Sequence, residues 1–192
     1  MTHHDRQTPF ALMVQTPLSD ADRQHCEMLL SRGELDAFRR KATMLLKTHD
    51  DVHLWKMLGR VEFQEIRIKD AIVAFRNVVR LSPDDVEAHA RLALLLLVDY
   101  QLDEAEAEAR TALSLERHDA QALIAMGRVL SVIGREEEAE SYLKEALKQQ
   151  PDNCKALAFL GDSYRARGRS EDAKACYSKV IEISPTDADA HR

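Results

Sequence analysis

The 192-residue sequence has few residues that break helices and few that favour strands. It contains six glycines and five prolines, and aromatic residues make up 5% of it. So few helix breakers exclude a disordered or low-complexity chain, and the scarcity of aromatic and β-branched residues disfavours a β-sheet. Alanine, leucine, glutamate, arginine and aspartate dominate instead. We therefore expect an all-α chain that is helical almost throughout.

Cysteine is scarce as well, and long apolar runs are missing. The three cysteines, Cys26, Cys154 and Cys176, are an odd number without C-x-x-C spacing, which disfavours a disulfide framework or a zinc ribbon. The longest apolar run, Leu92–Val98, is far shorter than the ~20 residues that span a bilayer. Phe10–Val14, near the N-terminus, is too short for a secretory signal. We expect a cytoplasmic protein without membrane insertion.

The sequence lacks an excess of positive charge and the common catalytic motifs. Its 33 acidic residues outnumber its 27 lysines and arginines, so no global attraction to nucleic acid is expected. It has no G-x-G-x-x-G, P-loop, H-E-x-x-H or G-x-S-x-G motif. His49 and His53 are four residues apart, but they lie on either side of a junction between two of the sequence repeats described below, so they do not share one helical face. We therefore expect no metal, no cofactor and no enzymatic activity in this chain alone.

What the sequence does contain is an internal repeat of 34 residues. Gly59 and Gly127 are 68 residues apart, and Gly161 lies 34 residues beyond Gly127. The same step links four alanines and three prolines, namely Ala71, Ala105, Ala139, Ala173, Pro83, Pro151 and Pro185. Because several residue types share one register, the spacing indicates a true structural repeat.

The period predicts four clear repeats, 52–85, 86–119, 120–153 and 154–187, and a weaker one, 18–51, before them. The weaker repeat has the small residue Ala37 but His25 where glycine is expected. Residues 1–17 are expected to form a flexible tail, with the alternative that Phe10–Val14 docks against a groove. Residues 188–192 are expected to begin a further helix that the sequence truncates.

Each repeat is predicted to form two helices. In 120–153 the first helix has one apolar face. Its residues follow the spacing i, i+3, i+4 and i+7, namely Leu123, Met126, Gly127 and Leu130. Gly134 interrupts this pattern, a second apolar face follows at Ala139, Leu143 and Ala146, and Pro151 ends it. We predict that small residues at the eighth and twentieth places let the paired helices approach closely.

This pattern resembles the tetratricopeptide repeat family. The family signature matches the last repeat at Leu157, Leu160, Gly161, Tyr164, Gly168, Ala173, Tyr177 and Pro185, and the first clear repeat at Trp55, Leu58 and Gly59. The second clear repeat departs from it at His89, Ala93 and Tyr100. The resemblance covers residues 18–187 and implies an α-solenoid of about five helical hairpins, forming a right-handed superhelix with a concave groove. It also implies a scaffold or adaptor that binds proteins.

The resemblance places positions 2, 5, 9 and 12 of each first helix on the concave groove. The predicted groove residues are His53, Lys56, Arg60, Phe63, Leu94, Leu97, Ile124, Arg128, Lys155, Asp162 and Arg165. This set is net positive with an apolar middle, which predicts a protein or peptide partner that is acidic and carries an apolar anchor. The alternative is that these cations are ordinary surface residues paired with neighbouring carboxylates.

The carboxylate clamp of some family members is not expected, since Arg91, Gln121 and Ala125 occupy places where it needs Asn, Lys and Arg. The last second helix predicts a possible association edge formed by Ala173, Tyr177, Val180 and Ile181. Two further alternatives remain open, the first favoured by that edge and the second by an apolar groove. One is the N-terminal recruiting or regulatory arm of a larger enzyme, such as a transferase with its catalytic domain beyond residue 192. The other is a secretion or assembly chaperone.

Overall fold

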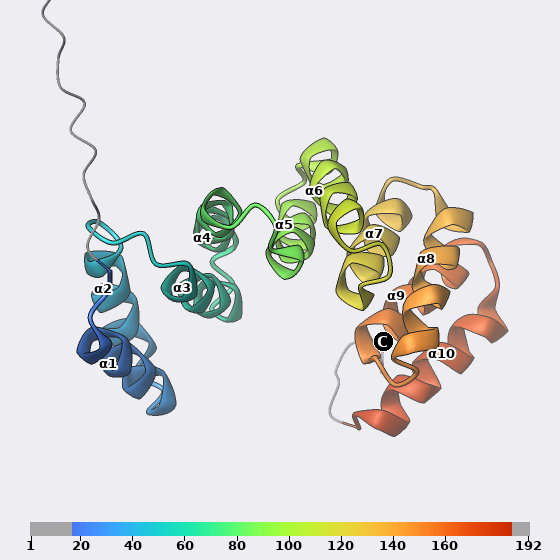
Figure 1. The fold of residues 1–192 in the computed structure, drawn as a ribbon. Helices are drawn as coiled ribbons and strands as arrows, with labels where there is room; N and C mark the ends of the chain where they lie inside the picture. The colour runs from blue at the N-terminus through green and yellow to red at the C-terminus, as the bar shows by residue number, and fades with distance from the viewer. Residues whose placement is uncertain (1–16, 186–192) are drawn as a thin grey trace, which may run out of the picture. The chain divides into compact units, whose positions relative to one another are not determined.

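A computed structural model describes residues 17–185 of the chain. These residues form ten α-helices and no strand, which confirms the all-α prediction (Figure 1). The chain divides into two compact units, Met1–Leu54 and Trp55–Arg192, which we call the N-terminal and C-terminal units. The predicted tail apart from Pro17, with its segment Phe10–Val14, and the predicted helix start at 188–192 lie outside the described residues.

The N-terminal unit holds one helical hairpin, α1 (Asp20–Ser31) and α2 (Leu35–Leu45). The Ser19 side chain caps α1 by accepting a hydrogen bond from the Asp22 N–H at 3.1 Å. An ion pair of 2.6 Å between Lys41 and Asp22 joins the two helices.

The register of this weaker repeat is one residue later than predicted. His25 is exposed, and its neighbour Cys26 is fully buried. In α2 the Phe38 side chain is fully buried, whereas Ala37 is only half-buried. Each residue advances a helix by about 100°, so a shift of one residue turns a side chain from the interface towards solvent. A cysteine thus occupies the place where we expected a glycine.

The C-terminal unit is a stack of hairpins. Its helices are α3 (Val52–Gln64), α4 (Ile68–Leu81), α5 (Val86–Val98), α6 (Leu102–Leu115), α7 (Ala120–Val132), α8 (Glu136–Gln149), α9 (Cys154–Ala166) and α10 (Ser170–Ile183). The boundary between the units falls within α3. The first helices, α3, α5, α7 and α9, begin at the first residues of the four clear repeats.

Short acidic or amide side chains fix where the first helices begin. Asp85, Asp119 and Asn153 precede α5, α7 and α9, and each accepts a hydrogen bond from the backbone N–H three residues later, at 3.0, 2.8 and 3.1 Å. Such caps satisfy backbone donors that have no partner inside the helix. The same cap at the same repeat position starts these helices in one register.

Glycine at the eighth repeat position permits close helix packing. An added Cβ would lie 2.7 Å from the Phe75 ring at Gly59, 2.6 Å from Leu143 Cγ at Gly127 and 2.6 Å from Tyr177 Cε1 at Gly161. The matching alanines of the second helices, Ala71, Ala105, Ala139 and Ala173, are all buried. The predicted role of these small residues is confirmed.

Candidate peptide-binding face

The predicted apolar middle of the groove is mostly part of the core, which corrects the sequence interpretation. Ile124 is 1% exposed and packs in one cluster with Leu123, Ala146 and Ala156. Leu97 is also buried, and Leu94 is half-buried. Ile124 is buried because its helix, α7, packs against α5, α6, α8 and α9, and these neighbours cover nearly the whole circumference of α7.

Several predicted groove cations are neutralised inside the chain. Lys56 in α3 forms an ion pair with Asp85, the cap of α5, and lies 3.9 Å from Glu87. Glu87 also accepts a hydrogen bond of 2.7 Å from Arg91. The alternative interpretation, cations paired with neighbouring carboxylates, therefore holds for Lys56.

Arg128 and Asp162 form a second internal pair, between the ninth residues of α7 and α9. Arg128 donates to the Asp162 carboxylate at 3.1 Å and lies over the Phe159 ring, 4.8 Å from its centroid. The same carboxylate accepts hydrogen bonds from Arg165 at 3.3 Å and from the Tyr177 hydroxyl at 2.8 Å. Asp162 thus organises the junction of the last two repeats.

The Tyr177 hydroxyl remains protonated at pH values well above those at which a tyrosine ordinarily ionises. Burial, followed by its hydrogen bond to the Asp162 carboxylate, raises the pKa of Tyr177 to about 12. Ionised Tyr177 would place a negative charge 2.8 Å from Asp162. This tyrosine is a structural hydrogen-bond donor at neutral pH.

Four predicted groove residues of the C-terminal unit remain exposed, namely Arg60, Phe63, Lys155 and Arg165, and Arg165 already pairs with Asp162 at 3.3 Å. Among the described residues, no ion-pair partner is found for Arg60 or Lys155. The Phe63 side chain is 49% exposed. His53 is exposed too, but it belongs to the N-terminal unit, where it lies 3.8 Å from Glu27. Arg60, Phe63 and Lys155, with half-buried Leu94, make up what we call the first-helix face.

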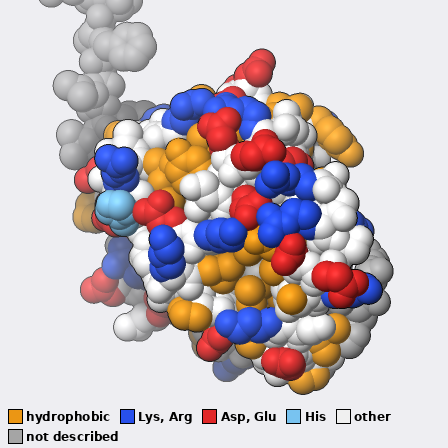
Figure 2. All heavy atoms as spheres, turned by 90° about the vertical axis from the view of Figure 1, so that its right-hand side faces the viewer, with side chains coloured by type: hydrophobic (Ala, Val, Ile, Leu, Met, Phe, Trp, Pro, Cys, Tyr) orange, Lys and Arg blue, Asp and Glu red, His pale blue; other side chains and the backbone are white. Residues whose placement is uncertain are grey.

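The predicted association edge on α10 is largely absent. Ala173 packs with Leu143 and Leu160, and Val180 packs with Leu157, so both are buried within the last repeats. Tyr177 and Ile181 are half-buried. Figure 2 shows that the apolar side chains on the right-hand side of Figure 1 form small patches divided by interleaved basic and acidic groups. The α9 helix covers the apolar side of α10, because the two helices pack as one hairpin.

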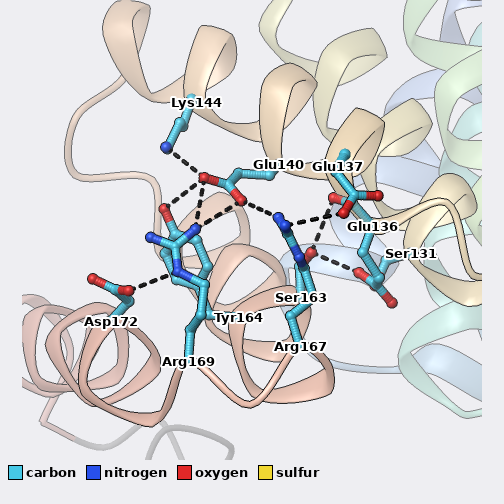
Figure 3. Close-up of polar contacts among 10 residues, drawn as sticks. All are labelled: Ser131, Glu136, Glu137, Glu140, Lys144, Ser163, Tyr164, Arg167, Arg169 and Asp172. Atoms are coloured by element: carbon cyan, nitrogen blue, oxygen red, sulfur yellow. Dashed lines mark hydrogen bonds and ion pairs between the residues drawn. The ribbon is translucent and has the colours of Figure 1, made fainter.

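A polar cluster that the sequence analysis missed joins α8 to the last repeat (Figure 3). The Glu140 side chain is 12% exposed and accepts hydrogen bonds from Lys144 at 2.6 Å, Arg167 at 2.8 Å and Arg169 at 3.1 Å. Arg169 also stacks on the Tyr164 ring, 4.2 Å from its centroid. The cluster locks the turn between α9 and α10 onto the preceding repeat.

A second part of this cluster lies closer to α7. The fully buried Ser163 hydroxyl donates to the Glu136 carboxylate at 2.6 Å, and Ser131 donates to the same oxygen at 3.1 Å. Glu137 pairs with Arg167 at 3.0 Å. The run Glu136–Glu138 at the start of α8 therefore binds neighbouring helices as well as complementing the helix dipole.

The described residues do not have the geometry of a metal site or of a membrane span. Between residues 17 and 185, no three His, Cys, Asp or Glu side chains gather in a way that could hold a metal ion. No helix in the same range has the length and apolar character needed to cross a membrane. The three cysteines are free.

The stacked hairpins define a helical-repeat scaffold, and residues 76–184 match the family model of the cilia and flagella-associated protein 70 middle TPR-like domain. Because this match covers more than half of the chain, the protein belongs to the tetratricopeptide-repeat family. No curated protein matches the sequence.

Solved tetratricopeptide-repeat structures share the fold at low sequence identity. YrrB, described as a TPR protein with an unusual peptide-binding site, is 21% identical, with a TM-score of 0.66 over 91% of this chain and 90% of YrrB. The thermophilic TPR protein TTC0263 from Thermus thermophilus is 22% identical, with a TM-score of 0.72 over 89% and 94%. MamA from Desulfovibrio magneticus RS-1 is 19% identical, with a TM-score of 0.70 over 88% and 96%. At these identities the likeness shows the fold alone.

Proposed function

We propose that this chain is a protein-interaction scaffold whose first-helix face binds an acidic peptide or partner segment with an apolar anchor. The observation that carries the proposal is the exposure of Arg60 and Lys155 without an ion-pair partner among the described residues, with the exposed Phe63 close in sequence to Arg60. Most other cations of the predicted groove are already neutralised internally. Partner carboxylates therefore have two available counter-charges on this face.

The structure changes which side chains would contact the partner. Ile124 and Leu97 are buried, so the apolar anchor would meet Phe63 and Leu94 instead. Lys56 and Arg128 would shape the surface rather than bind carboxylates, because their partners Asp85 and Asp162 already hold them. A reducing, cytoplasmic location suits the three free thiols and forms part of this proposal.

The alternative of a recruiting arm for an enzyme beyond residue 192 rested on an uncovered α10, as did self-association through that end. The burial of Ala173 and Val180 weakens this support, although Tyr177 and Ile181 are only half-buried. An assembly chaperone rested on an apolar groove, and the burial of Ile124 weakens it in the same way. The peptide-binding scaffold is the function that the exposed side chains favour most.

Fluorescence anisotropy with a labelled peptide tests the proposal. The probe carries one Phe flanked on both sides by Glu, and a second probe has Ser in place of every Glu. We expect the acidic probe to bind more tightly, and the double variant Arg60→Glu/Lys155→Glu to weaken its binding about tenfold. Lys148→Glu is the matched control, because Lys148 is exposed on α8, outside the first-helix face. Equal binding by the double variant and the control would disprove the proposal.

A further inference from the structure

Exposed apolar side chains of the C-terminal unit concentrate where first helices end. Large apolar side chains are exposed at nine places in the described residues, and five of these follow or close a first helix: Phe63, Ile66, Val98, Tyr100 and Val132. Phe63 belongs to the first-helix face, and we call the other four residues the turn edge. Lys56 in α3 lies 3.9 Å from Glu87 in α5, and α5 packs against α7, so the first helices of successive repeats are neighbours. Each is the first helix of an equivalent hairpin in the repeat stack, and equivalent helices of stacked repeats run in the same direction. Their C-terminal ends therefore lie along the same edge of the unit.

Two residues of the turn edge combine exposure with an unfavourable backbone. Ile66 is 81% exposed and Tyr100 is 86% exposed, and both have a φ of 59°. This left-handed conformation suits glycine and is unfavourable for β-branched or bulky residues. At the same repeat position the next two repeats have Gly134 and Gly168, with φ of 82° and 72°.

The fold itself does not use these two side chains. They bury almost no apolar surface, so packing does not offset the cost of the left-handed backbone. The glycines of the later repeats make the same turn without that cost. Isoleucine and tyrosine at this position therefore expose apolar area to solvent, where a partner can cover it.

Electrostatics indicate the charge of that partner. Helix C-termini carry partial negative charge, and α3, α5 and α7 have no basic residue in their last turns. Acidic residues lie beside the two exposed side chains in the sequence, namely Glu65 next to Ile66, and Asp99 next to Tyr100, with Asp103 following. The turn edge is thus apolar with a negative border.

The basic residues of these turns are mostly neutralised. Arg67 donates to the Glu62 carboxylate at 2.6 Å. Arg135 pairs with Glu106 at 3.0 Å and with Glu138 at 2.6 Å. Lys69, in the first turn of α4, is the exposed cation nearest to Ile66 in the sequence. Arg67 also lies 3.6 Å from Glu65, so the negative border is formed mainly by Asp99, Asp103 and the three helix ends. One lysine does not reverse the charge of that border.

We propose that the turn edge binds a protein segment in which lysine or arginine flanks apolar side chains. Apolar groups of the partner would cover Ile66 and Tyr100, and its cations would meet the carboxylates and helix C-termini beside them. This surface is separate from the first-helix face and prefers the opposite charge. The scaffold would accordingly hold two different partners at once.

The double variant Ile66→Gly/Tyr100→Gly of the full chain tests this proposal, because glycine is the residue that the later repeats use at this position. Two labelled peptides serve as probes, one of alternating Leu and Lys and one of alternating Leu and Glu. Both probes are measured in the Arg60→Glu/Lys155→Glu background, which weakens the acidic-peptide site, and there we expect the basic probe to bind about tenfold more tightly than the acidic one. We expect the glycine double variant to weaken the basic probe about fivefold or more, while its midpoint of thermal unfolding stays equal or rises. Val73→Ser, at a 55% exposed apolar residue of α4, is the control that should leave binding unchanged.

Three results would overturn the proposal. The first is a lower unfolding midpoint in the glycine variant, which would give Ile66 and Tyr100 a role in the fold. The second is equal binding of the two probes, or binding that the glycine variant leaves unaltered. The third is a concentration-dependent dimer in light scattering that the glycine variant abolishes, which would make the turn edge a contact between copies of this chain. Loss of acidic-probe binding in Arg60→Glu/Lys155→Glu concerns the first-helix face alone, so the two proposals fail independently.

Discussion

Glu106 and Glu140, 34 residues apart, make equivalent contacts at consecutive repeat junctions. Each pairs with a basic side chain one turn later in its own helix, Arg110 and Lys144, and with the arginine that precedes the next second helix, Arg135 at 3.0 Å and Arg169 at 3.1 Å. These two arginines also pair with an acidic residue three positions later. The period of the sequence thus repeats a polar clamp as well as the apolar core.

Glu140→Gln should lower the free energy of unfolding by about 1 to 2 kcal/mol at pH 7, because it leaves Arg167 and Arg169 without their shared carboxylate. Urea unfolding measures this change, and Glu182→Gln, at an exposed residue of α10, is the control. An equal effect of the two substitutions would show that the clamp adds no stability.

The same clamp predicts a dependence on pH. Burial acts to raise the pKa of the Glu140 carboxyl, but hydrogen bonds from Lys144 and Arg169 outweigh it and leave that pKa below its usual value. A carboxyl with a lowered pKa in the folded state stabilises the protein above its unfolded pKa of about 4.3, and this stabilisation is lost as the pH falls through the folded pKa. The stability difference between wild type and Glu140→Gln should therefore shrink on acidification below about pH 4. A difference that is constant from neutral to acidic pH would contradict the assignment.

Gly127→Ala should destabilise the fold although alanine is the better helix former. A Cβ there would lie 2.6 Å from Leu143 Cγ and 3.3 Å from the Ala139 carbonyl oxygen, and Leu143 is fully buried. Helix propensity favours alanine by about 1 kcal/mol, and overpacking typically costs about 1 to 3 kcal/mol, so we expect a net loss. Thermal unfolding measured by circular dichroism should show a lower midpoint than Ser141→Ala, an exposed substitution in α8. A raised midpoint would show that the helices can separate without cost.

Tyr177 should ionise later than the other tyrosines. Its pKa of about 12 is raised by burial and then by the Asp162 hydrogen bond. A tyrosine with a raised pKa stabilises the folded state fully below its unfolded pKa of about 10, and this contribution disappears as the pH rises through the folded value. An alkaline titration of tyrosinate absorbance should lose its last component in Tyr177→Phe. If that variant keeps the late component, another tyrosine is responsible.

The cysteines should differ in reactivity according to burial. Cys26 and Cys176 are buried, and burial raises the pKa of each thiol, so little reactive thiolate forms at neutral pH. Cys154 is half-exposed at the start of α9. A thiol-specific reagent should modify Cys154 quickly and the other two only after unfolding, as mass spectrometry of the timed reaction would show. Rapid modification of Cys26 in the folded protein would contradict its burial.

Much of the fold could be read from the sequence because the repeat imposes the same physical demands every 34 residues. Gly127 must be small where Leu143 packs against it, and Asp119 must follow a turn to cap α7. The weaker repeat was harder to place. There Cys26 replaces the expected glycine and the register differs by one residue, so the pattern around His25 was misleading.

The candidate site was less predictable, because helical periodicity shows which residues share a face but not how far the neighbouring helices cover it. Leu97 and Ile124 share the periodicity of exposed positions, yet the surrounding helices bury both. The pairing of Arg128 with Asp162 depends on the distance between two stacked repeats. The signal for the turn edge was present in the sequence, since Ile66 and Tyr100 stand where the following repeats have glycine.

The sequence by itself determined the period, the helix starts and the close-packing positions of the clear repeats, since each depends on contacts within a repeat or with the next one. The tertiary structure alone decided which charges stay available and which apolar groups remain exposed. Arg60 and Arg128 occupy the same repeat position, but of the two only Arg128 has a carboxylate partner, Asp162 of the next repeat, among the described residues. Exposure and charge pairing are properties of stacked surfaces, and their geometry is set only when the helices have packed.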